Sequence, residues 1–326
     1  MQRRLLGQWA VTAGLTTLGL CTAARAQQGF PNRPLRLVVP FPAGGGTDVL
    51  ARALGESLSR ELGQPVIVDN KAGAGTVIGN DVVAKSVPDG HTLLLTTSAI
   101  AIVPSLYPKL PYAAETALVP VLLLGVAPNV AVVRAESPLR SASDLLQRLR
   151  AEPGRLSYAS AGNGTTTHLA AELLKSSTGL SMAHVPYRGA TPAITDLLAG
   201  QVDLMFGTLP SVAPFIKSGK VRALGVTGAK RSPLFPDVPT FAESGAPGYS
   251  ADVLYGVFVT GGTPASAIER LGAAVRKASR TEGFQRRAEA EGLVLTLDGA
   301  AEALRIQRAE EAKWRQLIKA NGIIAE

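Results

Sequence analysis

Short apolar runs alternate along this chain with longer segments in which apolar residues recur at helical spacing. The apolar runs predict strands at residues 35–39, 65–68, 92–95, 156–159, 202–206 and 223–226. The segments of helical period predict helices at residues 49–62, 76–85, 168–176 and 209–218. Strands and helices that alternate in this way are typical of an α/β protein built around largely parallel sheets.

The middle and the end of the chain continue the pattern. Ser141 is predicted to begin a helix, and Thr191 to N-cap another helix with Pro192 at its first position. The remaining predicted strands lie at 119–124, 130–133, 255–259 and 294–296, and the remaining helices at 264–280 and 300–320.

Two glycine-rich turns each follow a predicted strand and open a predicted helix. The first runs from Pro40 to Asp48 with the sequence PFPAGGGTD, and the second from Ser160 to His168 with SAGNGTTTH. The first N–H groups of a helix lack intrahelical partners and carry partial positive charge, so each turn is a candidate anion site. One such turn is weak support, since glycine is needed there for backbone reasons alone. Two together predict a site for a small carboxylate contacted from two sides.

In the first turn, Gly44, Gly45 and Gly46 let the backbone approach a bound group closely. Thr47 or Asp48 is predicted to cap the following helix. An acid beside an anion site repels the ligand unless backbone N–H groups occupy its carboxylate, or unless it receives an ammonium or hydroxyl group of the ligand. We favour the capping role for Asp48, and the ligand-binding role stays open.

The second turn offers neutral donors. Gly162 and Gly164 allow sharp bends, and the hydroxyl and amide donors are Ser160, Asn163, Thr165 and Thr166. His168 lies in the first turn of the predicted helix. It either contacts the loop or the ligand, or has a packing role only. His91 and His184 are interpreted as structural. Because neither turn contains an arginine, we expect exchangeable, partly water-mediated binding instead of a tight charge clamp.

The N-terminal segment has the organisation of a signal peptide. Arg3 and Arg4 precede an apolar stretch at residues 9–20, and cleavage is expected after Ala26. The stretch is too short for a transmembrane helix, which needs about 20 apolar residues. General secretion is favoured over twin-arginine export, and a soluble periplasmic product over a lipoprotein anchored through Cys21.

Composition narrows the functional class. The 326-residue chain has a formal net charge of +8 and a single cysteine. Loss of residues 1–26 removes three arginines and no acid, so the mature net charge is +5 and no cysteine remains. Disulfides, thiol catalysis and cysteine metal sites are thereby excluded. The basic residues are dispersed, which argues against nucleic-acid binding. A mature chain of this length predicts two lobes.

Catalytic motifs are absent from the sequence. It contains no G-x-S-x-G, no H-E-x-x-H, no G-x-x-x-x-G-K-[ST] and no histidine pair at metal-ligand spacing. The run from Gly73 to Gly79 is close to a dinucleotide fingerprint, but its spacing is wrong. It is interpreted as a helix entry that needs glycine for close packing. We therefore expect no catalytic residue, no cofactor and no metal.

Five ordered motifs give the chain a resemblance to a known family. They are PFPAGGGTDVLAR, VDNKAGAG, YASAGNGTTTHLAAELLK, HVPYRGATPAITDLLAGQVDLMF and RALGVTGAKRSPLFPDVPTFAESGAPGY. Together they resemble the Bug family of extracytoplasmic solute receptors, the substrate-binding proteins of tripartite tricarboxylate transporters, over essentially the whole mature chain. The resemblance implies a type II periplasmic-binding-protein fold, with two α/β lobes, two crossing segments and a ligand cleft between the lobes.

The resemblance also implies an arrangement of lobes and ligand-binding residues. Residues 27–127 and 250–326 are expected to form lobe 1, and residues 128–249 lobe 2. Family members resemble one another in holding a ligand carboxylate between the two glycine-rich loops, partly through ordered water. With His168 included, the predicted ligand-binding residues are Ala43, Gly44, Gly45, Thr47, Asp48, Thr97, Ser98, Ser160, Gly162, Asn163, Gly164, Thr165, Thr166 and His168.

The chain departs from the family pattern at three positions. Ala72 stands where proline is usual, Leu254 where tryptophan is common and Gly207 where many members carry aspartate. If Leu254 and Gly207 lie near the distal end of the pocket, these changes favour an uncharged or bulkier ligand over an amino acid.

The sequence thus predicts a periplasmic receptor that does no chemistry. It is expected to be a monomer that captures a small organic carboxylate and delivers it to a membrane permease with a large and a small subunit. Two alternatives stay open. One is a sensory subunit that presents the bound carboxylate to a two-component kinase, and the other is a secreted enzyme on the same fold.

Overall fold

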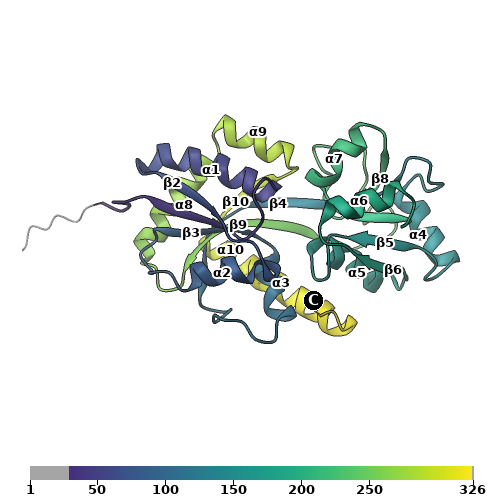
Figure 1. Cartoon of the computed structure of the whole chain (residues 1–326), viewed down its shortest axis with the longest axis horizontal. Helices are drawn as coiled ribbons and strands as arrows, with labels where there is room; N and C mark the ends of the chain where they lie inside the picture. The colour runs from purple at the N-terminus through teal and green to yellow at the C-terminus, as the bar shows by residue number, and fades with distance from the viewer. Residues whose placement is uncertain (1–28, 325–326) are drawn as a thin grey trace, which may run out of the picture.

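The chain forms two α/β halves that lie side by side, with strands β4 (Leu118–Arg134) and β9 (Asp252–Thr260) running between them (Figure 1). The structure is a computed structural model that describes residues 29–324. The predicted signal peptide, residues 1–26, lies outside the described residues. Among the helices that the structure describes, none combines the length and the apolar character needed to cross a membrane.

The first half contains both ends of the described chain. β1 pairs in parallel with β2 and β3, whereas β9 is antiparallel to β3 and β4. Besides β9, its strands are β1 (Leu35–Val39), β2 (Val66–Asn70), β3 (Thr92–Thr97) and β10 (Val294–Gly299). Its helices are α1 (Gly46–Leu62), the short 3-10 helix η1 (Ala74–Thr76), α2 (Val77–Ala84), α3 (Ala99–Leu106), α8 (Ala265–Ala278), α9 (Glu282–Ala290) and α10 (Ala300–Asn321).

The second half is built from the middle of the chain. β5 is parallel to β6 and β7, and β4 is antiparallel to β7 and β8. Its strands are β5 (Ser157–Ser160), β6 (Ala183–Pro186), β7 (Leu204–Thr208) and β8 (Val221–Val226), and its helices are α4 (Ala142–Ala151), α5 (Thr166–Thr178), α6 (Ala190–Leu198) and α7 (Leu209–Lys217).

Strand β4 carries the sheet from one half to the other. It pairs with β9 from Leu118 to Pro128, and with β7 and β8 beyond Asn129. The resulting strand order is β2-β1-β3-β9-β4-β7-β5-β6. The prediction of largely parallel sheets was therefore wrong, because the strands that join the halves run antiparallel to their neighbours.

Two strands predicted at 119–124 and 130–133 are one continuous strand. Gly125 and Pro128 lie between the two predicted ranges, yet both residues pair with β9. Glycine at position 125 allows β10 to lie close to β4, since a Cβ atom there would lie 2.1 Å from the carbonyl oxygen of Val294. The crossing between the halves thus lies inside a strand and not in a linker.

One smaller prediction was also wrong, and two helices were not predicted. Helix α6 begins at Ala190 with Gly189 as its N-cap, so Thr191 is not the cap. Helix α3 was not predicted because its sequence, AIAIVPSL, is apolar on every side. Helix α9 was missed because its sequence is largely polar and buries only Phe284 and Ala288.

One core cluster joins the two halves. It contains Leu94 and Ile100 from the first half, Leu145 and Leu169 from the second, and the buried Trp314 of α10. Because α10 and β4 contact both halves, the lobe boundaries at 127/128 and 249/250 stay a prediction.

Candidate ligand-binding site

A cavity of about 640 Å³ opens between the two halves. From the first half it is lined by the loop after β1, the loop before α2, the end of β3 and helix α3. From the second half it is lined chiefly by the second glycine-rich turn and the start of α5. The lining residues are Pro40, Phe41, Pro42, Ala72, Gly73, Gly75, Thr76, Thr97, Ala99, Ile102, Val103, Leu106, Tyr107, Ala161, Asn163, Gly164, Thr165, Thr166, Thr167, Gly189 and Thr208.

The second glycine-rich turn is built by its own hydroxyl groups. Gly162 and Gly164 have φ values of +132° and +70°, a backbone conformation that favours glycine. Thr165 is the N-cap of α5, and its hydroxyl donates to the carbonyl of Gly162 at 2.7 Å. The N–H groups of Thr166 and Thr167, the first two of α5, have no intrahelical acceptor. The turn therefore holds two backbone donors at the cavity wall.

His168 holds this turn from behind the cavity. Its Nδ1 accepts from the N–H of Gly164 at 3.0 Å, and its ring stacks on His184 with 3.9 Å between centroids. Burial lowers the pKa of His168 to about 4, and the nearby positive charge of Lys175 acts in the same direction, against the opposing charge of Glu172. The ring is thus neutral at neutral pH. Since Nδ1 is an acceptor, the single ring proton sits on Nε2.

Ser160 forms a hydrogen bond with the partly buried His184, whose ring stacks on His168. The Oγ of Ser160 is 2.7 Å from Nε2 of His184 and accepts from the N–H of Gly162. Ser160 is fully buried and does not line the cavity. Its hydroxyl group fixes the turn through these hydrogen bonds. This pair could not be predicted from the sequence, because Ser160 lies on β5 and His184 on β6.

The first glycine-rich turn is held by Asp48. One carboxylate oxygen accepts from the N–H of Gly44 at 2.8 Å and from Arg52, and the other accepts from the amide of Asn70. Burial raises the pKa of Asp48, but these hydrogen bonds outweigh it and hold the pKa below the ordinary value. The N-cap of α1 is Gly45, so neither Thr47 nor Asp48 is the cap. Asp48 instead stabilises the turn from inside the helix.

Part of the predicted site lines the cavity. Five predicted residues line it, namely Thr97, Asn163, Gly164, Thr165 and Thr166. The predicted residues outside the lining are Ala43, Gly44, Gly45, Thr47, Asp48, Ser98, Ser160, Gly162 and His168. Ligand contact by either group stays a prediction.

Two segments of the wall were not predicted. Helix α3 contributes four apolar residues, and the loop around η1 contributes Gly73, Gly75 and Thr76. The backbone of that loop is unusual, because Ala74 and Thr76 have φ values of +46° and +88°. Such conformations cluster at functional sites. The glycines of VDNKAGAG were the only sequence signal, and they were assigned to helix packing.

Among the three family departures, only Ala72 lines the cavity. Leu254 is buried in β9, where its N–H donates to Ser98. Gly207, in β7, lies against Val212 of α7. The hypothesis that Leu254 and Gly207 alter the distal pocket therefore has no support in this arrangement.

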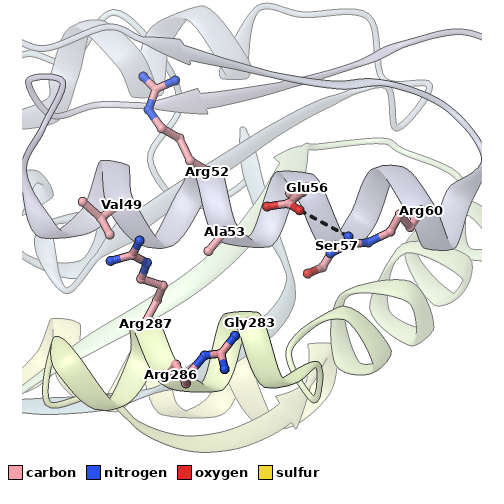
Figure 2. A pocket seen from close by; sticks show the side chains of 9 residues that line it. All are labelled: Val49, Arg52, Ala53, Glu56, Ser57, Arg60, Gly283, Arg286 and Arg287. Atoms are coloured by element: carbon pink, nitrogen blue, oxygen red, sulfur yellow. Dashed lines mark ion pairs between the residues drawn. The ribbon is translucent and has the colours of Figure 1, made fainter.

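A second hollow lies on the outer face of the first half, between α1 and α9 (Figure 2). Arginines line it, but three of them are ion-paired along their own helices: Arg52 with Asp48, Arg60 with Glu56 and Arg286 with Glu282. It receives nothing from the second half, so closure of the halves would not enclose it. Within residues 29–324, no cluster of metal-ligating side chains occurs.

Comparisons with known proteins agree with this architecture. The family described as tripartite tricarboxylate transporter family receptor matches residues 50–323. A Pseudomonas sp. protein described as lying in the tcbD-tcbE intergenic region is 42% identical over 317 residues, covering 96% of this chain and 94% of the relative. BugT of Bordetella pertussis is 36% identical over 320 residues, covering 98% and 96%.

Solved structures are similar over nearly the whole chain. The periplasmic binding protein BugD is 34% identical with a TM-score of 0.78, covering 91% of this chain and 100% of that chain. An R. palustris protein solved with adipate is 34% identical with a TM-score of 0.81 and the same coverage. MatC from Rhodopseudomonas palustris, solved with bound malate, is 31% identical with a TM-score of 0.75, covering 89% and 100%.

These matches confirm the predicted fold class and the resemblance to the Bug proteins. The chain belongs to the tripartite tricarboxylate transporter receptor family, whose members are periplasmic solute-binding receptors and not enzymes.

Proposed function

We propose that this protein captures a small organic carboxylate in the cavity between its halves and delivers it to a tripartite tricarboxylate-type permease with a large and a small subunit. The observation that carries the proposal is the cavity itself, which receives walls from both halves and has the N-terminus of α5 at its edge. Two similar structures, of 34% and 31% identity, were solved with adipate and malate, both carboxylates.

The donors at α5 suit a carboxylate that must also be released. The N–H groups of Thr166 and Thr167 and the Thr166 hydroxyl have no hydrogen-bond partner among the described residues. A carboxylate placed there gains neutral donors and the favourable end of the helix dipole. A ligand held without an arginine clamp exchanges readily.

Closure of the two halves supplies the signal to the transporter. A ligand that contacts both halves binds the closed form better than the open form, so it shifts the population toward closure. Strand β4 passes between the halves, and the side chain of Asn129 donates to the carbonyl of Thr166, the first residue of α5. Rotation about this segment would move α5 relative to α3. We propose export through the predicted signal peptide and action as a periplasmic monomer.

Thr166→Ala tests the site. Loss of the free hydroxyl is expected to weaken binding of adipate or hexanoate about tenfold to hundredfold, as expected for one hydrogen bond to a charged group. Calorimetry on the mature protein measures it. Thr195→Ala is the matched control, because Thr195 is exposed on α6 and bonds only within its helix. Equal affinities for wild type and Thr166→Ala would remove the Thr166 hydroxyl from the site.

A further inference from the structure

The interlobe cavity is lined by no described side chain that is charged at neutral pH. Its lining within residues 29–324 contains no lysine, arginine, histidine, aspartate or glutamate. Its one phenol, Tyr107, has a pKa raised by burial and stays neutral at neutral pH. A bound molecule with one carboxylate can use the donors at α5, but a second charged group would find no counter-charge in this wall.

Polar and apolar groups lie on different walls. Free backbone donors lie at the start of α5, whereas α3 presents Ile102, Val103 and Leu106, followed directly by Tyr107. Among the other threonines of the lining, Thr208 donates to Ser211, whereas Thr76 and Thr97 accept from Asn80 and from the N–H of Ala99, and none of them lies on the α3 wall. The cavity is therefore amphipathic, with one end suited to an anion and one wall suited to hydrocarbon.

The apolar wall also forms part of the contact between the halves. A Cβ atom on Gly164 would lie 2.3 Å from Cδ1 of Leu106, so α3 packs directly against the turn that holds the donors. A ligand whose carboxylate binds at α5 must place its remainder along α3. Burying hydrocarbon there is favourable, whereas burying a second, unpaired carboxylate is strongly unfavourable.

We propose that this receptor selects monocarboxylates whose remainder is an apolar chain or ring, with the carboxylate at Thr166 and the hydrocarbon against α3. This inference rests on the proposed function and names its substrate class. It sets the chain apart from two similar structures that were solved with the dicarboxylates adipate and malate.

Two pairs of acids test the proposal. Hexanoate and adipate share a six-carbon chain, and benzoate and terephthalate share a ring, so each pair differs by one carboxylate. Calorimetry at pH 7.5 on the mature protein is expected to give at least tenfold tighter binding of the monocarboxylate in one or both pairs. Hexanamide and benzamide, the neutral analogues, are expected not to bind measurably.

The outcomes separate the two proposals. Tighter or equal binding of both dicarboxylates would overturn the substrate class and leave carboxylate capture standing. Binding of the amides as tightly as the acids would overturn carboxylate capture itself. Absence of binding by all four acids would overturn both.

A variant provides an independent test. Tyr107 is only partly buried, and Tyr107→Arg places a cation on the apolar wall. The ratio of adipate affinity to hexanoate affinity is expected to rise at least tenfold. Ile67→Arg adds the same charge on β2, where Ile67 is 58% exposed and outside the cavity, and should leave the ratio unchanged. A ratio that Tyr107→Arg does not alter would contradict placement of the hydrocarbon against α3.

Discussion

The Nδ1 atom of His168 accepts a hydrogen bond from the backbone N–H of Gly164 at 3.0 Å, which ties the second glycine-rich turn to the first turn of α5. His168→Leu would leave this buried N–H without an acceptor. We expect the free energy of unfolding to fall by about 1–3 kcal/mol. Urea unfolding of the mature protein measures it.

The same variant should also weaken carboxylate binding, because the turn that orients the donors of α5 loses its anchor. His91→Leu is the control for binding, since His91 is buried against Phe30, away from the cavity. If both variants bound hexanoate as wild type does, the His168 contact would have no role in the site.

The two stacked histidines predict a stability that depends on pH. Burial lowers the pKa of His168 and of His184 to about 4, and in His184 the neighbouring His168 adds to the effect. Between about pH 6.5 and 4, these two histidines therefore bind more protons in the unfolded chain than in the folded protein. Stability is fully present above about pH 6.5 and falls as the pH drops toward 4.

For His168 alone the loss corresponds to about 3 kcal/mol across that window. Urea unfolding at intervals between pH 7.5 and 4.5 measures the slope. In His168→Leu the slope should be distinctly shallower. An equal slope in both proteins would assign the pH dependence to other groups.

The regular parts of the fold could be predicted, whereas the junction between the halves could not. Strand β1 and helix α1 followed from local apolar periodicity, and the capping box at Ser141 and Asp144 marked the start of α4. The continuity of strand β4 was not predicted, because its pairing partners are distant in the sequence. Pairing with β9 is what keeps Gly125 and Pro128 inside the strand.

The candidate site, too, was predicted only in part. The donors at α5 were predictable because a glycine-rich turn before a helix is a local signal. The apolar wall on α3 was not, because AIAIVPSL has the composition of a buried core segment. Only its position against Gly164 makes it a wall of the cavity. Sequence patterns thus indicated the donors at which we propose that the carboxylate binds, but not the apolar wall opposite them.

Asp48 is expected to stabilise the first turn and not to repel the ligand. Asp48→Ala removes the acceptor for Gly44, Arg52 and Asn70 at once. We expect a loss of about 2–3 kcal/mol in the free energy of unfolding, because these are charge-assisted bonds to a buried group. Thermal and urea unfolding measure it.

Glu56→Ala provides the matched control on the same helix. Glu56 is exposed and pairs only with Arg60, so its removal should change the free energy of unfolding by less than about 0.5 kcal/mol. Tighter carboxylate binding by Asp48→Ala, with little loss of stability, would instead indicate that Asp48 repels the ligand.

Gly79 fixes the distance between α2 and the cavity wall. A Cβ atom there would lie 2.7 Å from Cβ of Pro40 and 2.9 Å from the carbonyl oxygen of Lys71, and neither atom can swing aside. We expect Gly79→Ala to lower the free energy of unfolding by about 1–3 kcal/mol through overpacking. Because Pro40 lines the cavity, hexanoate binding should weaken as well.

Gly283→Ala is the control that measures the effect of a glycine-to-alanine substitution without a steric clash. Gly283 lies in α9, and a Cβ atom there meets nothing within 4 Å. Alanine at that position should raise the free energy of unfolding by about 0.4–1 kcal/mol, because it reduces the freedom of the unfolded chain. Urea unfolding of the two variants side by side should give shifts of opposite sign. Shifts of the same sign would mean that the contact of Gly79 with Pro40 does not limit the packing of α2.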